Sequence, residues 1–230
     1  MLNSQHTTDI ISKFELYLDD SSELSSTDEL ELVNKIYQEI CDDRPWEFLK
    51  KPAAGTLTTG VDSFGNAQYY ISVPTDFREF AINNQSNDNT VGTENNMSPK
   101  VIFLSTQTNG YTPWQVVNFS DRRQYLKSQG YAYLDMANSK IILCAAPNAT
   151  DLTYEFDYIK IPPDLTAATV APYSDPLFPA RYWDAIYHKM AADDQIIQIF
   201  DRAHSYMAEN QARYQKILLD MQYFNSNLQI

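Results

Sequence analysis

The spacing of apolar residues changes twice along this 230-residue chain, and these changes constrain its fold more than any other feature. Up to about residue 51, and again from about residue 179, apolar residues recur at steps of three and four, as on one face of an α-helix. Between these regions short runs alternate apolar and polar residues and are separated by proline and glycine, a pattern typical of β-strands joined by turns. The sequence therefore predicts an α+β fold.

Two helices are expected before residue 51. The first spans about residues 8–18. The second begins at residue 26 or 27, because Ser26 and Glu29 have the spacing of a capping box, and it ends before Pro45, whose ring disfavours a helical conformation of the preceding residue. We expect the two helices to pair as an antiparallel hairpin. The apolar stripe of the second helix consists of Leu30, Val33, Ile36, Tyr37 and Ile40.

Residues 52–162 are expected to form a small antiparallel β domain of five or six strands. The expected strands are 68–73, 101–104, 114–119, 131–136, 140–144 and 152–158. Residues 137–139 are few enough to form a hairpin turn, and a short helix is expected at 121–127. The polar tract 83–99 has too few apolar groups to offset the entropy lost on ordering, so it is predicted to be a mobile loop.

The last part of the chain is expected to return to helix. Five prolines between residues 162 and 179 indicate a semi-extended connector, and helices are expected at about 179–194 and 200–224. The second helix carries a stripe of Met207, Asn210, Tyr214, Ile217, Met221 and Phe224. This stripe is either a core face that packs on the N-terminal hairpin or a coiled-coil seam between copies. We therefore divide the chain into a helical bundle of residues 1–51 and 163–230 and an inserted β domain of residues 52–162.

The formal net charge of −13 restricts the kind of partner. Twelve of the thirty acidic residues precede residue 48, where only three basic residues occur. A protein that wraps nucleic acid needs a clustered basic face to displace counterions, so direct binding to nucleic acid is disfavoured. The acidic segment is either a solvated helical face, or a surface that docks on a basic partner or lines a passage through which DNA slides without sticking.

The sequence lacks the patterns that place reactive groups or cofactors. Cys41 and Cys144 stand alone, which argues against a disulfide framework or a zinc site and favours a reducing compartment. No phosphate-binding loop, nucleophile elbow or zinc-binding helix motif is present, and no apolar stretch is long enough to span a membrane. We interpret His6, His188 and His204 as surface or interface residues. No enzymatic activity, cofactor or metal is expected.

Aromatic residues and the end of the chain both indicate binding surfaces. Sixteen tyrosines and eleven phenylalanines suit large interfaces, because aromatic rings provide broad contact areas. After Phe224 the chain has poor helix formers and then two apolar residues that no later residue covers, Leu228 and Ile230. We interpret Phe224, Leu228 and Ile230 as anchors for a groove on another subunit; the alternative is a frayed end. If they are anchors, removing residues 225–230 should leave the melting temperature of the monomer nearly unchanged.

Six segments, in their order along the chain, resemble the adaptor, or head-completion, proteins that lie beneath the portal of tailed bacteriophages. They are Leu-Tyr-Leu-Asp-Asp-Ser at 16–21, Asp-Arg-Pro-Trp-Glu-Phe-Leu at 43–49, Tyr-Ile-Ser-Val-Pro-Thr-Asp-Phe-Arg at 70–78, the hairpin end at 143–147, the strand and connector at 158–165, and Tyr-Trp-Asp-Ala-Ile at 182–186. The resemblance covers nearly the whole chain. It implies a helical bundle with an inserted β domain, and a ring, usually of twelve copies, that joins the portal to the tail.

The resemblance also implies the partners. They are the portal protein on one side and tail, nozzle or stopper proteins on the other, while genomic DNA passes through the ring without sequence-specific binding. The protein then belongs to the neck of the virion, is made in the host cytoplasm, and needs no cofactor or membrane. Phe224, Leu228 and Ile230 are expected to contact the portal.

Two alternative functions remain open at this stage. The first is another aromatic-rich module for attaching a tail or fibre. The second is a cell-wall hydrolase, because some related proteins of short-tailed phages are credited with this activity; Glu39 or Glu47 would then supply the acid.

Overall fold

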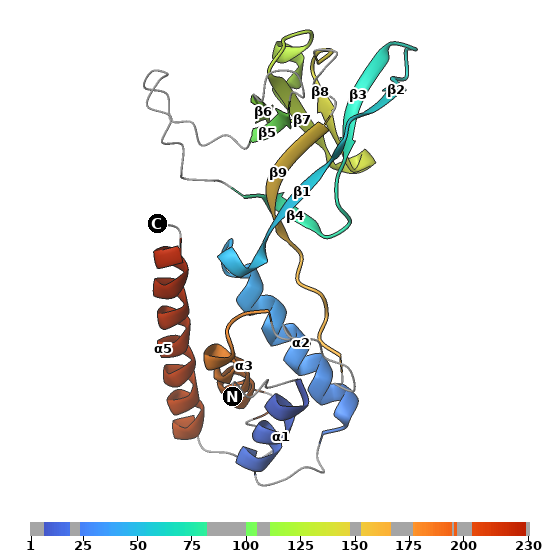
Figure 1. The fold of residues 1–230 in the computed structure, drawn as a ribbon. Coiled ribbons are helices and arrows are strands. Elements are labelled where there is room, and N and C mark those ends of the chain that lie inside the picture. The colour runs from blue at the N-terminus through green and yellow to red at the C-terminus, as the bar shows by residue number, and fades with distance from the viewer. Residues whose placement is uncertain are drawn as a thin grey trace. The chain divides into compact units, whose positions relative to one another are not determined.

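The chain folds into two compact units, one helical and one formed by β-strands (Figure 1). The computed structural model describes residues 7–18, 24–81, 100–104, 111–147, 153–166, 177–194, 196 and 204–228. The helical unit combines residues 1–49 and 162–230, and the β unit consists of residues 50–161. The mixed α and β composition predicted from the two changes of periodicity is confirmed.

Four α-helices form the described part of the helical unit, and they meet at α3. The helices are α1 (Thr7–Leu18), α2 (Ser26–Asp42), α3 (Asp184–Ala191) and α5 (His204–Leu228), with short 3-10 helices η1 (Glu47–Leu49) and η4 (Ala180–Tyr182). Helix α3 contacts α1, α2 and α5, and six of its eight residues are buried. It is therefore a central element, short enough to be enclosed by longer helices that keep one face in water.

Helix α2 begins at Ser26, as predicted, but its capping box lies one residue earlier than the predicted pair Ser26 and Glu29. Ser25 is the N-cap: its hydroxyl oxygen accepts a hydrogen bond from the Asp28 backbone N–H at 3.2 Å, and the Asp28 carboxylate accepts one from the Ser25 N–H at 3.3 Å. The expected pair, Ser26 and Glu29, fits the same spacing rule but is not the one used. Tertiary packing decides between the two pairs, because Glu29 is turned inward and buried.

The stripe on α5 is a core face rather than an external seam. Asn210, Tyr214 and Met221 are buried, but α5 packs mainly on α3 and not, as the sequence predicts, on the N-terminal helices, because α3 lies between them. The helix also extends to Leu228, four residues beyond its predicted end. The predicted mobile loop at 83–99 lies outside the described residues.

The described strands of the β unit belong to one mixed sheet rather than an antiparallel one. They are β1 (Lys50–Thr56), β2 (Thr58–Val61), β3 (Ala67–Ser72), β4 (Phe77–Phe80), β5 (Lys100–Leu104), β6 (Tyr111–Val117), β7 (Tyr131–Asp135), β8 (Lys140–Leu143) and β9 (Thr153–Lys160). The strand order is β1-β9-β5-β6-β7-β8-β3-β2, and β4 also pairs with β9. The pair β6–β7 is parallel, because residues 118–130, including the 3-10 helix η2 (Arg122–Tyr125), carry the chain back along β6, so that β7 begins opposite Gln115 and runs in the same direction.

Three strands, β1, β2 and β4, were not predicted. Strand β1 contains Pro52 and Gly55, and its apolar and polar residues do not alternate regularly, so its sequence is typical of a linker. It tolerates Pro52 because it stands at one end of the strand order and pairs only with β9. Strand β2 is mostly exposed and lacks an apolar face. Strand β1 becomes a strand through pairing with the distant strand β9, and β2 through its hairpin pairing with β3; their own residue patterns record neither pairing.

The sheet curls around an apolar core. Strands β1 and β2 stand at opposite ends of the strand order, yet only the buried residue Leu57 separates them in the chain. The two ends of the sheet must therefore come together, which leaves one face enclosed. The enclosed residues are Leu57, Ile71, Phe77, Val101, Trp114, Val116, Ala132, Ile141, Leu143, Phe156 and Tyr158.

A charged tie holds β4 and β9 to β1. The Tyr158 hydroxyl donates to Asp76 Oδ1 at 2.6 Å, and Lys51 Nζ donates to Asp76 Oδ2 at 3.0 Å. Burial by itself raises the pKa of Asp76, but these hydrogen bonds and the Lys51 charge outweigh it, so the pKa of Asp76 lies below its ordinary value. The carboxylate is therefore ionised at neutral pH and stabilises the pairing of these three strands.

Replacing Glu29 with glutamine should stabilise the protein at neutral pH. Burial, followed by the charges of Glu15 and Asp28, raises the pKa of Glu29. A raised pKa in the folded state means that stability falls as pH rises from the unfolded value, about 4.3, through the folded one. Glu29→Gln removes this penalty, so its melting temperature should exceed that of the wild type at pH 7, and the two should converge near pH 4.

The matched control is Glu31→Gln, which alters an exposed carboxylate on the same helix. It should produce no such pH-dependent gain in melting temperature. An equal gain in both variants at pH 7 would show that the effect comes from the overall negative charge and not from the burial of Glu29.

Candidate partner-binding site

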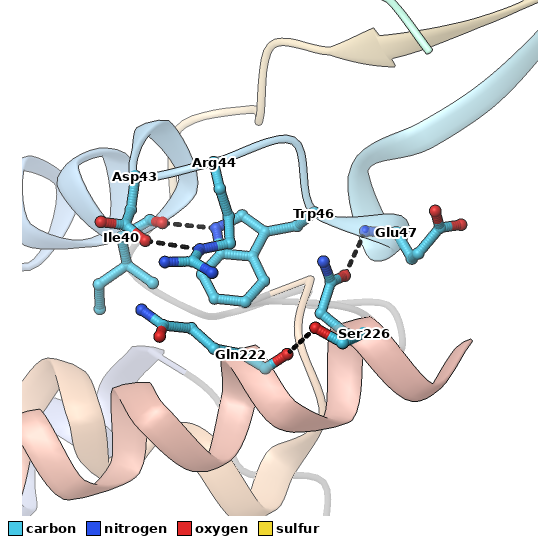
Figure 2. A network of polar contacts seen from close by, with 8 residues as sticks. Ile40, Asp43, Arg44, Trp46, Glu47, Gln222 and Ser226 are labelled. Carbon is cyan, nitrogen blue, oxygen red and sulfur yellow. Dashed lines mark hydrogen bonds and ion pairs between the residues drawn. The ribbon is translucent and has the colours of Figure 1, made fainter. Parts of the chain in front are cut away.

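The segment after α2 lies against the last turns of α5 (Figure 2). Helix α2 ends at Asp42, three residues before Pro45. Arg44 Nε then donates to Asp43 Oδ2 at 2.8 Å, and its guanidinium group lies 5.2 Å from the centre of the Trp46 ring. These contacts fix the chain as it leaves the helix and direct Trp46 inward.

Trp46 closes the end of α2. Its side chain is only 1% exposed, and its indole N–H donates to the backbone carbonyl of Ile40 at 2.7 Å, which satisfies one of the carbonyl groups at the helix end. The Trp46 ring stacks on Phe48 with centroids 5.5 Å apart, and Phe48 in turn packs against Phe178 at 5.7 Å. Tyr37 of α2 also contacts Phe178, at 5.9 Å. The four rings join α2, η1 and the connector that precedes α3.

Asn225 connects this segment to α5. Its side-chain oxygen accepts a hydrogen bond from the Glu47 backbone N–H at 2.7 Å, and Asn225 is buried. One position later, the Ser226 hydroxyl donates to the backbone carbonyl of Gln222 at 3.0 Å. These bonds explain why α5 continues through residues that are poor helix formers. No sequence signal could reveal the first bond, because its partners are 178 residues apart.

The predicted anchors have different positions in the structure. Phe224 is half-buried against its own chain: its ring lies 6.0 Å from Tyr182, and the Arg181 guanidinium group covers it at 4.4 Å. Leu228 is the last residue of α5, but its side chain and all of Ile230 lie outside the described part of the chain. The structure thus describes the surroundings of one anchor, Phe224.

Two exposed apolar residues on α5 were missed by the sequence analysis. Leu219 is 62% exposed and Tyr223 is 74% exposed. They are four residues apart, so they are neighbours on the outer face of the helix. The search for a periodic stripe found the buried face instead, and an isolated exposed apolar residue in a sequence carries no signal of its own. Together they extend the apolar surface near the end of α5.

The described residues form no evident reactive cluster. His188 is buried, not at the surface as the sequence predicted: its Nδ1 lies 2.9 Å from Asn210 Oδ1 between α3 and α5, and burial lowers its pKa, so it is a neutral core residue. Cys41 and Cys144 are buried thiols that are not joined in a disulfide. Within the described ranges, no three His, Cys, Asp or Glu residues are grouped to hold a metal ion. Glu39 is exposed on α2, and Glu47 is half-buried at the start of η1.

The described helices were not found to have the character of membrane-spanning helices. None of them combines the length and apolar character needed to cross a bilayer.

The negative charge is concentrated in the helical unit. Residues 50–161 contain nine lysines and arginines and ten acidic residues, a net charge of −1. The helical unit therefore carries −12 of the total of −13. The two units consequently present very different electrostatic surfaces to a partner.

In this region aromatic and polar groups hold distant segments of the helical unit together, while Leu219 and Tyr223 remain exposed. The sequence profile of the SU10 adaptor protein family matches residues 7–228. The chain belongs to this family, which is a phage head–tail adaptor family, and the predicted resemblance is confirmed. The protein is accordingly a structural adaptor of a phage. No curated protein matches the chain.

Replacing Asn225 with alanine should destabilise the helical unit. The substitution removes the acceptor of the Glu47 N–H at a buried position, a loss that typically costs about 1–3 kcal/mol in free energy of unfolding. Asn227→Ala is the matched control, because Asn227 is exposed on the same helical turn and alanine is the better helix former. Urea unfolding followed by circular dichroism compares the two. Equal stability of both variants would show that the Asn225 bond contributes little.

Proposed function

We propose that this protein forms a ring that joins the portal to the tail in the neck of a tailed phage. The observation that carries the proposal is the match to the SU10 adaptor protein family over residues 7–228. In the proposed assembly the helical unit is a bundle, the β unit is a separately folding inserted domain, and the ring contains twelve copies. Its partners are the portal on one side and tail, nozzle or stopper proteins on the other.

The distribution of charge supports a role beside DNA without binding to it. A protein that holds a phosphate backbone needs clustered basic groups, whereas the helical unit carries −12. A ring that exposes this charge to its channel repels the phosphates of the genome, so that the DNA passes without sticking.

The end of α5 is the proposed portal contact. Phe224, Leu228 and Ile230 are its anchors, and Leu219 and Tyr223 widen the apolar surface. The Trp46 cluster and the Asn225 bond hold this end of α5 against the remainder of the helical unit. A surface that is rigid before binding loses less entropy when it docks, which favours attachment.

The isolated protein should be monomeric at micromolar concentration and should form a ring only on the portal. Copies that each carry −13 repel one another until a partner surface aligns them. Sedimentation velocity of the protein, with and without purified portal, measures this directly. A stable ring without portal, insensitive to salt, would contradict the prediction.

Removing residues 228–230 should abolish portal binding while the fold remains intact. The expectation that removing residues 225–230 leaves the melting temperature nearly unchanged is wrong, because that deletion destroys the bond between Asn225 and Glu47. The shorter deletion retains this bond, so the free energy of unfolding should change by less than about 0.5 kcal/mol. Each buried large apolar side chain contributes roughly 1.5–3 kcal/mol per copy, and repetition around a ring multiplies the loss.

A portal pull-down compares this truncation with Asn225→Ala, which keeps all three anchors but loosens the end of α5, so it should weaken binding less than the truncation does under conditions where it is folded. Capture of the truncated protein at wild-type strength would place the attachment surface elsewhere, with the acidic face of α2 as the next candidate.

A further inference from the structure

The turn between β2 and β3 is fixed by one carboxylate. Asp62 Oδ1 accepts hydrogen bonds from the backbone N–H groups of Phe64 and Asn66 at 2.9 and 2.8 Å, and Oδ2 accepts one from the Asn66 side chain at 3.0 Å. Gly65 adopts a φ of 82°, a conformation in which glycine alone is unstrained, and its N–H donates to the Asp62 carbonyl at 3.0 Å. The turn therefore has a defined shape before it meets any partner.

This fixed turn presents a phenylalanine to the solvent. Phe64 is 88% exposed, the most exposed large apolar side chain in the described part of the chain, and Val61 next to the turn is also exposed. A large apolar side chain on a rigid turn loses little conformational entropy when it enters a pocket. These are the properties of a binding anchor.

A pocket of about 620 Å³ lies beside the same turn in the β unit. Its walls come from β3, β7, β8 and the segment after η2, and its apolar lining includes Tyr69, Leu126, Tyr133, Ile142, Cys144 and Ala145. The backbone N–H of Lys127 donates to the Cys144 carbonyl at 2.8 Å, which holds the rim in place. A pocket of this size accommodates an aromatic side chain together with parts of the residues next to it in the chain.

Phe64 lies on a turn beside the pocket of its own chain but does not enter that pocket. Asp62 and Asn66 line the pocket, whereas Phe64 does not and remains in solvent. One copy can therefore fill the pocket of a second copy and still offer its own pocket to a third. This is the property of a head-to-tail contact, which closes into a ring when the rotation between copies permits it.

We infer that Phe64 of one copy inserts into this pocket of the adjacent copy and forms the contact between neighbouring β units. The inference rests on the proposed ring and assigns the surface through which its copies touch.

Charge supports a second copy as the occupant. The β unit has a net charge of −1, so its copies approach without the repulsion that the helical units exert. The pocket lining contains one basic residue, Lys127, and one acidic residue, Asp62, so its charges balance, and the incoming turn can place its own Asp62 beside Lys127. Hydrogen bonds from the Asn66 side chain and from the backbone of Asn66, Phe64 and Gly65 lower the pKa of Asp62, which keeps that charge in place at neutral pH.

Photocrosslinking of the full-length protein tests the contact. Phe64 is replaced by the photoreactive analogue p-benzoylphenylalanine, which keeps an aromatic ring at the position, and the protein is irradiated on purified portal. Mixing isotopically labelled and unlabelled copies separates crosslinks between copies from those within one copy. The expected product is a ladder of crosslinked oligomers, with attachment at Leu126, Tyr133 or Ala145 of a different copy.

The matched control places the same analogue at Met136, which is exposed on the same unit but does not line the pocket. It should yield no ladder. In parallel, Phe64→Ala should raise the concentration for half-assembly on the portal by roughly tenfold or more, as expected when a buried aromatic contact is lost, while Phe64→Tyr and Met136→Ala should not.

Each other outcome overturns the inference. A ring that forms on the portal without crosslinks from position 64 would show that the copies meet through another surface, and the proposed function would stand. Crosslinked dimers without higher oligomers would indicate a twofold contact, and crosslinks only to the portal would make Phe64 an anchor for that protein. Failure of any ring to form would reject both the contact and the proposed function.

Discussion

The pairing of β1 with β9 is the constraint on which the rest of the structure depends. Lys50 lies opposite Ile159 and Thr56 lies opposite Thr153, so the segments that enter and leave the β unit run antiparallel along seven paired positions. The chain consequently returns, after more than a hundred residues, to within one strand spacing of its point of departure. Helices encoded at the two ends of the sequence can then share one core, because the insertion between them closes on itself.

Strand β9 also organises the sheet on its other side. It pairs with β4 and β5 in addition to β1, and Tyr158 from its centre reaches Asp76 at the start of β4. Because β1 continues into β2 at the far end of the strand order, the same pairing forces the sheet to curl. The curl produces the enclosed core.

The helical unit depends on a different kind of interaction, a buried aromatic cluster with satisfied polar groups. Trp46 gains burial and a hydrogen bond to Ile40 together, which is the arrangement that makes a buried indole stabilising. In the same way, the buried Asn225 side chain accepts a hydrogen bond from the backbone N–H of Glu47. The same unit carries −12 of the net charge of −13.

The sequence by itself determined the class of fold, the approximate place of each described helix and the family. Helical spacing at both ends and alternation in the middle are local properties, so they can be recognised in the sequence without knowledge of the fold. For the same reason the sequence predicted six of the strands, namely β3 and β5 to β9. The ordered set of weak motifs identified the family, since their arrangement over the whole chain carries more information than any single motif.

Only the tertiary structure decided the features that depend on distant partners. Ser25 rather than Ser26 caps α2 because Glu29 is drawn into the core, and α5 passes Asn225 because Glu47 supplies a backbone donor. Strand β1 forms because it pairs with β9, and β2 forms because it pairs with β3. Strands β6 and β7 are parallel because of the path that residues 118–130 take between them. The interface residues proposed from the sequence, Phe224, Leu228 and Ile230, stay a prediction, and the exposure of Leu219, Tyr223 and Phe64 was not predicted. Exposure is the result of what the remainder of the chain covers, and a one-dimensional pattern contains no measure of it.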